Sequence, residues 1–554
     1  MNLRKILLIA FVFSGMAALI YELTWIRPLQ FLLGSTTYTI SIIFAVFMLG
    51  LGIGSLIISK YIEKIKNLPL TYAIMELGIG LYGVLLLSIF NLLPELYNKL
   101  YFLHTNFYLF EFVQFFIILI VLLIPTTLMG ASFPIIAKFY TQEKIGKSIG
   151  EIYSANNLGA IIGSFATGFI LIPLLGIKMS IIIAGIINLL IGFLIILVAE
   201  KKLIKKIIPV ILILFVVLAY FGDYNIQQMH SGGFYRTAAI QESLGDVLYY
   251  KEGLYATVSV RDLLGKGKAL FINGKPQGSN EILDSRVNFL LAYLPKLLNP
   301  EISKSLVIGL GTGTTSGQLS LVSNVTTVEI EPLISETSRY FEKINSNVLE
   351  NSNHNLIIDD GRNYLLKNKE KYDAIIPEPC DPWQSFSSSL FSKEFFELAK
   401  KNLKDNGIYA QWVPIYQMNI EDFKNFYKTF NSVFPNVIAF ANIKSDENTP
   451  IKLETSEIIF IGSTQKIEVS QEKLTTNYNL LPEKSKQFLE ALKLNSGEQI
   501  FHLILFDEED LKNYSENAKL ITEDNFLLEF STAKNVLNQN PKEVINDIEK
   551  FISR

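Results

Sequence analysis

The sequence predicts a multi-span α-helical membrane domain followed by an α/β domain. Apolar residues dominate residues 1–221, whereas most of the Lys, Glu, Asp and Asn residues lie in residues 222–554. The first part contains hydrophobic stretches of about 20 residues, the length that a bilayer requires. The second part alternates strand-like and helical stretches, which is typical of a sheet covered by helices.

The composition excludes several classes of function. The 554 residues carry a net charge of −3, so no basic field attracts nucleic acid and we expect no such partner. Cys380 is the one cysteine, which excludes an intrachain disulfide. The four histidines, at positions 104, 230, 354 and 502, lack the spacing of zinc ligands, so we predict no metal site. Enzymatic chemistry would then rest on carboxylates and an organic cofactor.

Residues 1–221 form the predicted membrane domain, with about seven hydrophobic segments. The first follows Arg4 and Lys5 without a convincing cleavage site, so we expect a retained helix. The fourth contains Pro125 and Pro134, which favour a bend or a re-entrant segment. The segments lie at residues 6–26, 36–59, 69–93, 106–136, 152–174, 177–199 and 207–221.

The loop charges predict the orientation of these segments. Lys and Arg residues gather at the N-terminus and after the second, fourth and sixth segments. Such loops stay in the cytoplasm, so the N-terminus should face the cytoplasm. Seven full crossings would then place the second half outside the cytoplasm. We expect a multi-pass protein of the cell (inner) membrane.

Polar residues at the end of the first segment have two interpretations. Tyr21, Glu22 and Arg27 could line a functional cavity, because ionisable groups at membrane depth usually face the bundle interior. They could instead anchor the helix at the interface, with Trp25 at the headgroups and Glu22 paired to Arg27. Two further carboxylates lie in later segments, Glu76 and Glu111.

Residues 222–300 are predicted to be a connector followed by a small β unit. Gly232 and Gly233 interrupt the helical pattern. Residues 255–260 and 269–274 resemble strands, and the Gly-Lys-Gly sequence at 265–267 offers a turn between them. We therefore expect a small antiparallel unit before the main domain.

The main domain, residues 301–554, begins with a strand that runs into a glycine-rich turn. An apolar strand from residue 305 leads into Gly309, Gly311 and Gly313. Glycines let the backbone approach a nucleotide, and a helix that starts after them favours anionic groups. On this motif alone an ordinary tight turn remains the alternative.

Acidic residues follow the next strands of the predicted sheet. The strand at 325–331 places Glu329 about 20 residues after the glycines, where a ribose-binding acid belongs. The strand at 355–361 ends with Asp360 and Gly361, which could meet an adenine edge. Further strands lie at 372–378 and 407–413, with a helix at 392–402 between them. We predict a parallel sheet with a ligand at the carboxyl ends of its strands, although each acid alone could be a solvated loop residue.

The order of these motifs resembles the spermidine-synthase group of aminopropyltransferases, relatives of class I methyltransferases with a Rossmann-like fold. It looks most like the bacterial branch that is fused to a membrane domain, over nearly the whole chain. In the membrane half the matching stretches are Tyr21-Glu22-x-x-Trp25 and residues 125–134 and 153–160. In the second half they are residues 273–275, 309–313 and 390–396, Glu378-Pro379-x-x-Pro382-Trp383, and residues 522–525 with 528–530.

The resemblance implies a role for each matching residue. Glu378 stands at the position of the family's catalytic aspartate, and Asp381 at that of a second aspartate, which helps to bind the amine. Trp383 could cover the site or contact a cationic substrate, or else pack within its loop. The residues implied to bind the adenosyl donor are Gln277, Gly309, Gly311, Gly313, Glu329, Asp360 and Gly361.

The sequence departs from the family at three positions. Thr312 stands where soluble spermidine synthases carry an aspartate that holds the donor's amino group. Glu378 is one methylene longer than the catalytic aspartate. Val287 and Asn288 lie where a tyrosine is expected. These departures bear on the identity of the donor and acceptor more than on adenosyl binding.

The expected enzyme is a polyamine aminopropyltransferase. It would use decarboxylated S-adenosylmethionine and an amine acceptor that is putrescine-like, a polyamine or partitioned into the membrane. Glu378 would take the proton of the attacking amine while Asp381 holds a distant ammonium. A methyltransferase that uses S-adenosylmethionine, which Thr312 favours, and a non-enzymatic polyamine sensor or transporter are the alternatives.

The resemblance also bears on partners and location. Besides the amine and the lipid bilayer, it allows a homodimer. Adenosyl donors are cytosolic, which requires an even number of crossings and conflicts with seven. The shortest segment, 207–221, would then not cross fully, and we place the catalytic domain in the cytoplasm.

Overall fold

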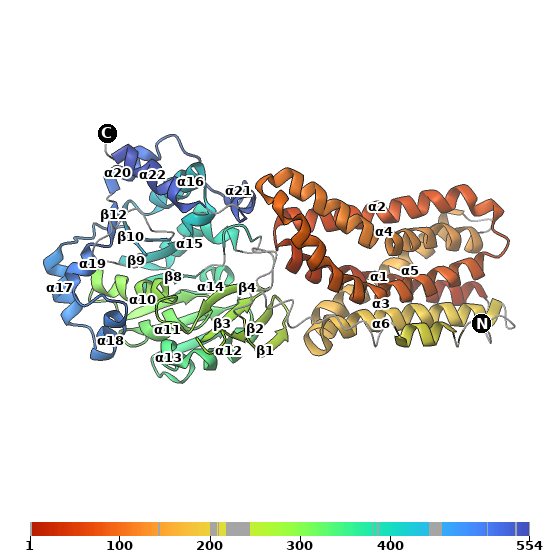
Figure 1. Cartoon of the computed structure of the whole chain (residues 1–554), viewed down its shortest axis with the longest axis horizontal. Coiled ribbons are helices and arrows are strands. Elements are labelled where there is room, and N and C mark those ends of the chain that lie inside the picture. The colour runs from red at the N-terminus through yellow and green to blue at the C-terminus, as the bar shows by residue number, and fades with distance from the viewer. Residues whose placement is uncertain are drawn as a thin grey trace. The chain divides into compact units, whose positions relative to one another are not determined.

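The computed structural model describes residues 3–141, 145–199, 208, 210–217, 244–378, 381–384, 387–442, 457–506, 508–537 and 540–552. The chain divides into two compact units (Figure 1). The first consists of Met1–Gln241 and Lys251–Thr257, and the second of Glu242–Tyr250 and Val258–Arg554. The predicted boundary between residues 221 and 222 lies outside the described residues.

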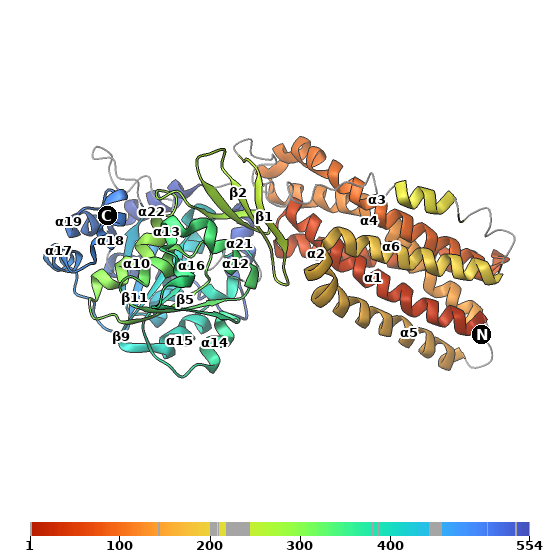
Figure 2. The same ribbon diagram turned by 90° about the horizontal axis from the view of Figure 1, so that it is seen from below.

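The first unit is built from long apolar helices (Figures 1 and 2). Thr36, Asn67 and Asn106 cap three of them, because each side chain accepts a hydrogen bond from a backbone N–H in the first turn. α4 continues through Pro125 and Pro134. The helices are α1 (Leu3–Leu33), α2 (Thr37–Tyr61), α3 (Leu68–Leu100), α4 (Phe107–Tyr140), α5 (Ile145–Ala166) and α6 (Ile172–Ala199).

Within the described part of the chain, five helical stretches are long and apolar enough to cross a membrane. The fifth, Ile145–Ala199, has 55 residues and would be about 80 Å long as one helix, far more than a bilayer core. Gly176, with φ 79° and ψ 173°, interrupts it. The segments predicted at 152–174 and 177–199 therefore meet at this break. Of the segment predicted at 207–221, residues 208 and 210–217 are described and are helical.

Close contacts show the relative directions of the helices. On α5, Gly159 faces Val12 and Gly163 faces Met16 of α1, so these two helices run in the same direction. The pairs Ser14–Glu76 and Tyr21–Gly83 show that α3 is parallel to α1. The pairs Gly78–Leu128 and Tyr82–Val121 show that α4 is antiparallel to α3. The pairs Gly50–Thr126 and Gly54–Ala131 show that α2 is parallel to α4.

The sixth helix returns in the opposite direction. Gly185 of α6 lies by Gly80 of α3, and Gly192 lies by Ala73, so the two helices are antiparallel. α1, α3 and α5 thus run one way, and α2, α4 and α6 run the other way. α6 therefore ends on the side of the unit where α1 begins.

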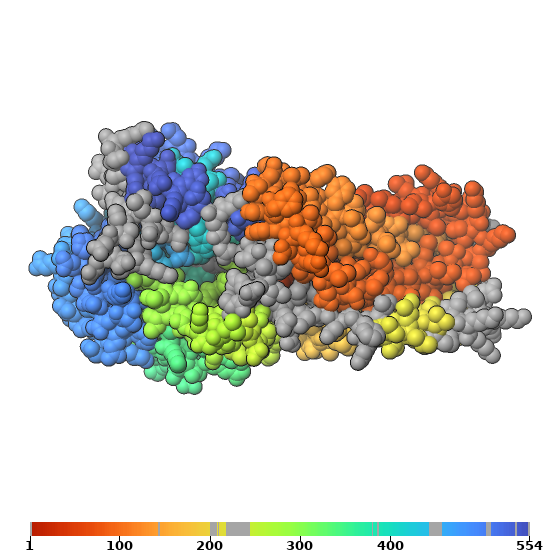
Figure 3. All heavy atoms as spheres, in the orientation of Figure 1, coloured from red at the N-terminus to blue at the C-terminus, as the bar shows by residue number. Residues whose placement is uncertain are grey.

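In this unit large apolar side chains are exposed and several polar side chains are buried, the reverse of the usual distribution in a protein surrounded by water. Large apolar side chains are exposed, such as Leu56 (66%), Ile120 (72%) and Leu174 (75%). Glu76 and Asn188 are buried, at 0% and 1% exposure. The surface of this unit, drawn red to yellow in Figure 3, therefore has the apolar character of helices that face lipid.

A four-stranded sheet comes next along the chain, in the order β1-β2-β3-β4. β2 pairs antiparallel with β3, and β3 with β4. Asn273 (φ 48°) and Gly274 (φ 76°) form the two-residue turn between β3 and β4, as expected of an Asn-Gly hairpin. The strands are β1 (Val247–Glu252), β2 (Thr257–Asp262), β3 (Lys268–Ile272) and β4 (Lys275–Ser279).

The main sheet of the second unit has the strand order β12-β10-β11-β9-β8-β5-β6-β7. Strands β5 to β9 are parallel, which confirms the Rossmann-like fold. These are the five strands predicted from the sequence, and β11, β10 and β12 extend the sheet with antiparallel strands beside β9. The strands are β5 (Lys304–Ile308), β6 (Asn324–Glu329), β7 (His354–Ile358), β8 (Tyr372–Pro377), β9 (Leu403–Val413), β10 (Asn436–Ala441), β11 (Ile458–Ser463) and β12 (Ile504–Phe506).

Helices cover this sheet and enclose an aromatic core. Tyr409 of β9 stacks on Phe434 with ring centroids 4.9 Å apart, and Phe396 of α15 lies edge-on to Phe430 of α16 at 5.3 Å. Each such pair adds about 1 kcal/mol to the burial of its rings. The helices are α10 (Arg286–Leu298), α11 (Thr314–Leu319), α12 (Pro332–Thr337), α13 (Glu342–Asn345), α14 (Gly361–Lys367), α15 (Lys393–Asn402), α16 (Ile420–Val433), α17 (Gln471–Asn479), α18 (Glu483–Ala491), α19 (Gly497–Phe501), α20 (Glu508–Tyr514), α21 (Leu527–Asn535) and α22 (Pro541–Ile552).

The strand order reverses beside β5. The chain first adds β6 and β7 on one side of β5, and then places β8 and β9 on the other side. Connections that leave β5 and β8 in opposite directions open a crevice at the carboxyl ends of these two strands. The fold thus positions a ligand site where β5 and β8 end.

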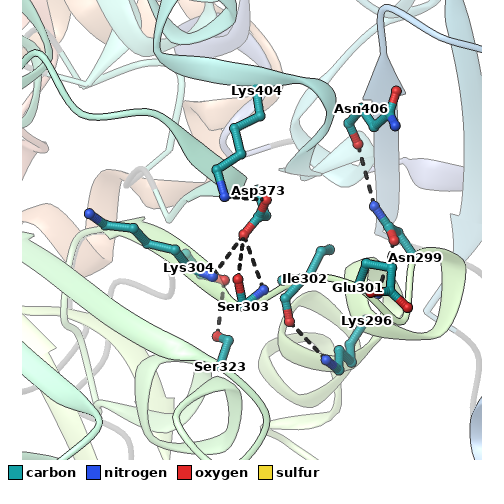
Figure 4. A network of polar contacts seen from close by, with 11 residues as sticks. Lys296, Asn299, Glu301, Ile302, Ser303, Lys304, Ser323, Asp373, Lys404 and Asn406 are labelled. Carbon is teal, nitrogen blue, oxygen red and sulfur yellow. Dashed lines mark hydrogen bonds and ion pairs between the residues drawn. The ribbon is translucent and has the colours of Figure 1, made fainter.

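A polar network joins the amino-terminal ends of β5, β8 and β9 (Figure 4). Asp373, near the start of β8, accepts hydrogen bonds from the backbone N–H groups of Ser303 (3.1 Å) and Lys304 (2.9 Å) and forms an ion pair with Lys404 of β9 (2.8 Å). Burial tends to raise the pKa of Asp373, but these bonds outweigh it and hold the pKa below its usual range.

We predict that Asp373→Asn lowers the free energy of unfolding by about 1–3 kcal/mol at neutral pH, because one charged acceptor serves three strands. A lowered pKa in the folded state gives stability that is present above the unfolded-state pKa, about 3.9, and is lost as the pH falls. Denaturant unfolding of both proteins from pH 7 to pH 3 should show the difference shrinking. Asp405→Asn on β9, next to Lys404, is the control, and an equal loss there would contradict the prediction.

Candidate active site

The loop between β5 and α11 depends on glycine. Gly309, Gly311 and Gly313 have φ values of 98°, 53° and 79°, a left-handed conformation that strains other residues. A Cβ at Gly309 would lie 3.0 Å from the carbonyl oxygen of Glu378. The loop therefore lies directly beside the end of β8.

Glu329 fixes this loop from the end of β6. Its Oε2 accepts a hydrogen bond from the N–H of Leu310 (2.8 Å), and its Oε1 accepts one from the N–H of Glu331 (2.9 Å). Burial raises the pKa of Glu329, and these backbone hydrogen bonds oppose the rise. The acid predicted to bind ribose is thus held beside the glycines.

Asp360 and Gly361 lie at the end of β7. Asp360 caps α14, since its Oδ1 accepts a hydrogen bond from the N–H of Asn363 (2.7 Å). Gly361 packs on Ile308, the residue that precedes the glycine loop, with no room for a Cβ. Gly361 therefore lies beside the start of the glycine loop, with Asp360 directly before it in the chain.

Glu378 extends from the end of β8 over the loop. Its N–H donates to the carbonyl of Ile308 (2.8 Å), and its Oε2 lies 4.0 Å from the position of a Cβ on Gly311. Its Oε1 accepts hydrogen bonds from the Asn288 side chain (3.2 Å) and the Thr315 hydroxyl. Burial raises the pKa of Glu378 to about 7, although these two hydrogen bonds act to lower it.

Asp381 is buried and already has partners. Its Oδ1 accepts a hydrogen bond from Nε2 of Gln417 (2.7 Å), and its Oδ2 forms an ion pair with Lys275 of β4. Gln417 ends a 3-10 turn, Ile415–Gln417, that follows β9. The chain thus supplies a cation at the carboxylate that the sequence assigns to a substrate ammonium.

Strand β4 also reaches the glycine loop. A Cβ at Gly278 would lie 3.3 Å from the side-chain methyl of Thr312. The hydroxyls of Thr312 and Thr314 lie 2.7 Å apart. In the neighbouring position of the strand, Nε2 of Gln277 is buried and has no hydrogen-bond partner among the described residues.

Trp383 is 2% exposed and lies inside the loop that follows β8. Residues 379–380 of the predicted motif are outside the described residues. The burial of Trp383 favours packing within its loop.

The three membrane-half candidates belong to the first unit. Tyr21 is buried and stacks on Trp25 at 4.8 Å between ring centroids, and Glu22 is 9% exposed. Arg27 donates hydrogen bonds to the carbonyls of Gly253 (3.0 Å) and Leu254 (3.1 Å), in the 251–257 segment of the same unit.

Four polar residues of the site did not emerge from the sequence as site residues. Asn288 and Thr315 contact Glu378, whereas Lys275 and Gln417 contact Asp381. Asn288 was noted only as a departure from the family, although an amide there can donate to a carboxylate. Thr315 had a signal, since it lies in the first turn of the helix after the glycines.

Comparison with known protein families gives a match to the spermine/spermidine synthase domain over residues 285–465. This matched region includes the glycine loop, Glu329, Glu378 and Asp381. The resemblance seen in the sequence is therefore confirmed.

Curated relatives extend beyond the synthase domain. Polyamine aminopropyltransferase 2 of Aquifex aeolicus is 24% identical over 415 residues, which cover 74% of this chain and 79% of that protein. Polyamine aminopropyltransferase of Corynebacterium efficiens is 26% identical over 422 residues, which cover 73% and 76%. Among solved structures, spermidine synthase from Thermotoga maritima is 20% identical, covers 49% of this chain and 87% of that one, and gives a TM-score of 0.38.

We predict that Thr315→Val raises the pKa of Glu378, because the variant removes a hydrogen bond to the charged carboxylate while it keeps the side-chain shape. The acid limb of kcat/KM should move from about pH 7 to a higher pH, by roughly one unit. The adjacent Thr314→Val, whose hydroxyl bonds to Thr312, is the matched control. An acid limb that moves equally in both variants would contradict the assignment.

Proposed function

We propose that the second unit transfers an aminopropyl group from decarboxylated S-adenosylmethionine to an amine. The observation that carries this proposal is the position of Glu378. Its carboxylate lies over the glycine loop at the switch point of the sheet, with a pKa raised to about 7. The relatives named polyamine aminopropyltransferases support the reaction class.

The residues around the loop fit an adenosyl donor. Gly309, Gly311 and Gly313 leave the backbone accessible for close approach, as nucleotide-binding turns require. Glu329 would hold the ribose hydroxyls, and Asp360 with Gly361 would border the adenine. Nε2 of Gln277, buried beside the loop, offers a donor that a ligand can satisfy.

Glu378 would act as the general base. The donor supplies a carbon activated by its sulfonium, and the acceptor must attack it as a neutral amine. A carboxylate with a pKa near 7 can take the amine's proton and hold it as the new carbon–nitrogen bond forms. Asn288 and Thr315 fix the orientation of Oε1, which leaves Oε2 directed at the loop.

Asp381 would select the acceptor. A putrescine-like acceptor or a polyamine carries a second ammonium, which would bind Asp381 in competition with Lys275. An acceptor with one amine, including a membrane-partitioned one, would leave that ion pair intact. The acceptor's charge therefore decides whether Lys275 must move.

A methyltransferase that uses S-adenosylmethionine is a second candidate, and one observation favours it. Thr312 places a hydroxyl and a methyl group where a carboxylate would hold the amino group of the decarboxylated donor. The two reactions leave different products, because aminopropyl transfer releases methylthioadenosine and methyl transfer releases S-adenosylhomocysteine.

The full-length chain should therefore be incubated with putrescine or spermidine and each donor in turn. We expect methylthioadenosine and an aminopropylated amine from the decarboxylated donor. Formation of S-adenosylhomocysteine from S-adenosylmethionine would instead support the methyltransferase. Glu378→Gln should lower turnover at least about 100-fold while adenosyl binding by calorimetry persists.

Glu370→Gln, at the far end of the sheet where Glu370 pairs with exposed Lys304, is the matched control. Full turnover in Glu378→Gln would refute the assignment of the base. Unchanged nucleotide and amine with the intact protein would instead indicate a sensor or transporter.

We propose that the first unit spans the cell membrane with the second unit in the cytoplasm. Hydrogen bonds from Arg27, near the end of α1, and from Ile177, near the start of α6, hold residues 252–254 on the side of the unit opposite the N-terminus, so the orientation is a matter for experiment. The break at Gly176 and the alternating helix directions give six crossings up to the end of α6, which lies on the side of the N-terminus. The cationic residues at Lys60–Lys66, Lys138–Lys147 and Lys201–Lys206 would then share that side.

In oriented vesicles, protease should reach the C-terminus only when the cytoplasmic face is outward. A tag in the loop between α2 and α3 should behave like the C-terminus, and a tag between α1 and α2 should behave in the opposite way. Protection of the C-terminus together with exposure of the α2–α3 tag would support seven crossings instead.

A further inference from the structure

A buried carboxyl group joins three helices of the first unit. Glu76 of α3 is 0% exposed. One carboxylate oxygen accepts a hydrogen bond from the Ser14 hydroxyl of α1 (2.7 Å), and the other accepts one from the Asn188 side chain of α6 (2.6 Å). Glu76 therefore lies at the junction of α1, α3 and α6.

The face of α3 around Glu76 is shaped to admit polar side chains. Gly80 and Gly83 share this face at the i+4 and i+7 positions. The Cβ of Asn188 lies 3.1 Å from the position of a Cβ on Gly80, and the Tyr21 ring occupies the space beside Gly83. Oη of Tyr21 and Oδ1 of Asn188 are buried without a hydrogen-bond partner in the described residues.

In the described part of the chain, the junction holds no compensating positive charge. Among the described residues, no Lys, Arg or His forms an ion pair with Glu76, and its two hydrogen-bond donors are neutral. The other titratable groups that face it are the phenols Tyr21 of α1 and Tyr72 of α3, and α6 contributes the uncharged Asn188. An isolated carboxylate in such surroundings is strongly disfavoured against its neutral form.

The neutral acid fits the same contacts. A protonated carboxyl keeps one carbonyl acceptor for the Asn188 side chain. Its hydroxyl can donate to Ser14, because a serine hydroxyl accepts as well as donates. The packing of the three helices thus matches a carboxyl group that carries a proton.

We propose that Glu76 is a proton-binding site of the helical unit. In the packed arrangement the carboxyl group holds the proton. Release of that proton to water leaves a buried anion, which the junction can stabilise only by admitting water or a cation between α1, α3 and α6. An ionisable group at membrane depth is usually functional for this reason. The site is independent of the adenosyl site and gives the helical unit a chemistry of its own.

Dicyclohexylcarbodiimide tests the proposal, because this apolar reagent modifies protonated carboxyl groups in apolar surroundings. The full-length protein in lipid vesicles should form an adduct that mass spectrometry locates on Glu76, and the yield should fall as the pH is raised. Glu76→Gln should remove this adduct. Glu111→Gln, a matched change on α4, should leave it unchanged.

The same vesicles provide a readout that does not require the variant to fold. Absence of an adduct on Glu76 of the wild-type protein at every pH, while other carboxyl groups react, would overturn the proposal. Protection of Glu76 by sodium or spermidine at constant pH would also overturn it, since the occupant would then be a cation other than the proton. A yield that depends on pH alone supports the proton.

Discussion

The left-handed turn at residues 309–313 is the constraint around which the second unit is arranged. Three glycines with positive φ let the backbone bend tightly at the end of β5. One peptide of this turn donates to Glu329 from β6, and the turn leaves just enough space for the Glu378 backbone from β8. A Cβ at Gly309 would press on the Glu378 backbone and one at Gly313 on Val348, so the position of Glu378 depends on this turn.

Much of this arrangement was predictable because parallel strands end at one edge of a sheet. The glycines, Glu329, Asp360 and Glu378 each end or follow a strand, and contacts at Ile308, Gly309 and Leu310 bring these strand ends together. The contacts that tune the carboxylates were not predictable. Asn288 comes from a helix and Lys275 from a hairpin, and their distance in sequence from Glu378 and Asp381 gives no local pattern. Strands β10 to β12 were missed because the alternation of strands and helices weakens toward the C-terminus.

For the first unit, the sequence predicted the helices but not how they pack. Hydropathy located the helices well, since about 20 apolar residues suffice to identify each one. It gave no relation between them, which depends on close contacts at glycines such as Gly159 and Gly185. The sequence also drew attention to Tyr21, Glu22 and Arg27, which follow one another along a helix. Glu76 stands alone in its segment, and only the packing of three helices shows how completely it is enclosed.

The switch point beside β5 also orders events during synthesis. The ribosome releases β5, β6 and β7 before β8, so the glycine turn and Glu329 exist as a local unit before Glu378 emerges. The reactive carboxylate joins only when β8 inserts next to β5 and its N–H bonds to Ile308. The relation between Glu378 and the glycine turn therefore depends on the pairing of β8 with β5, and it is complete only when the sheet is complete.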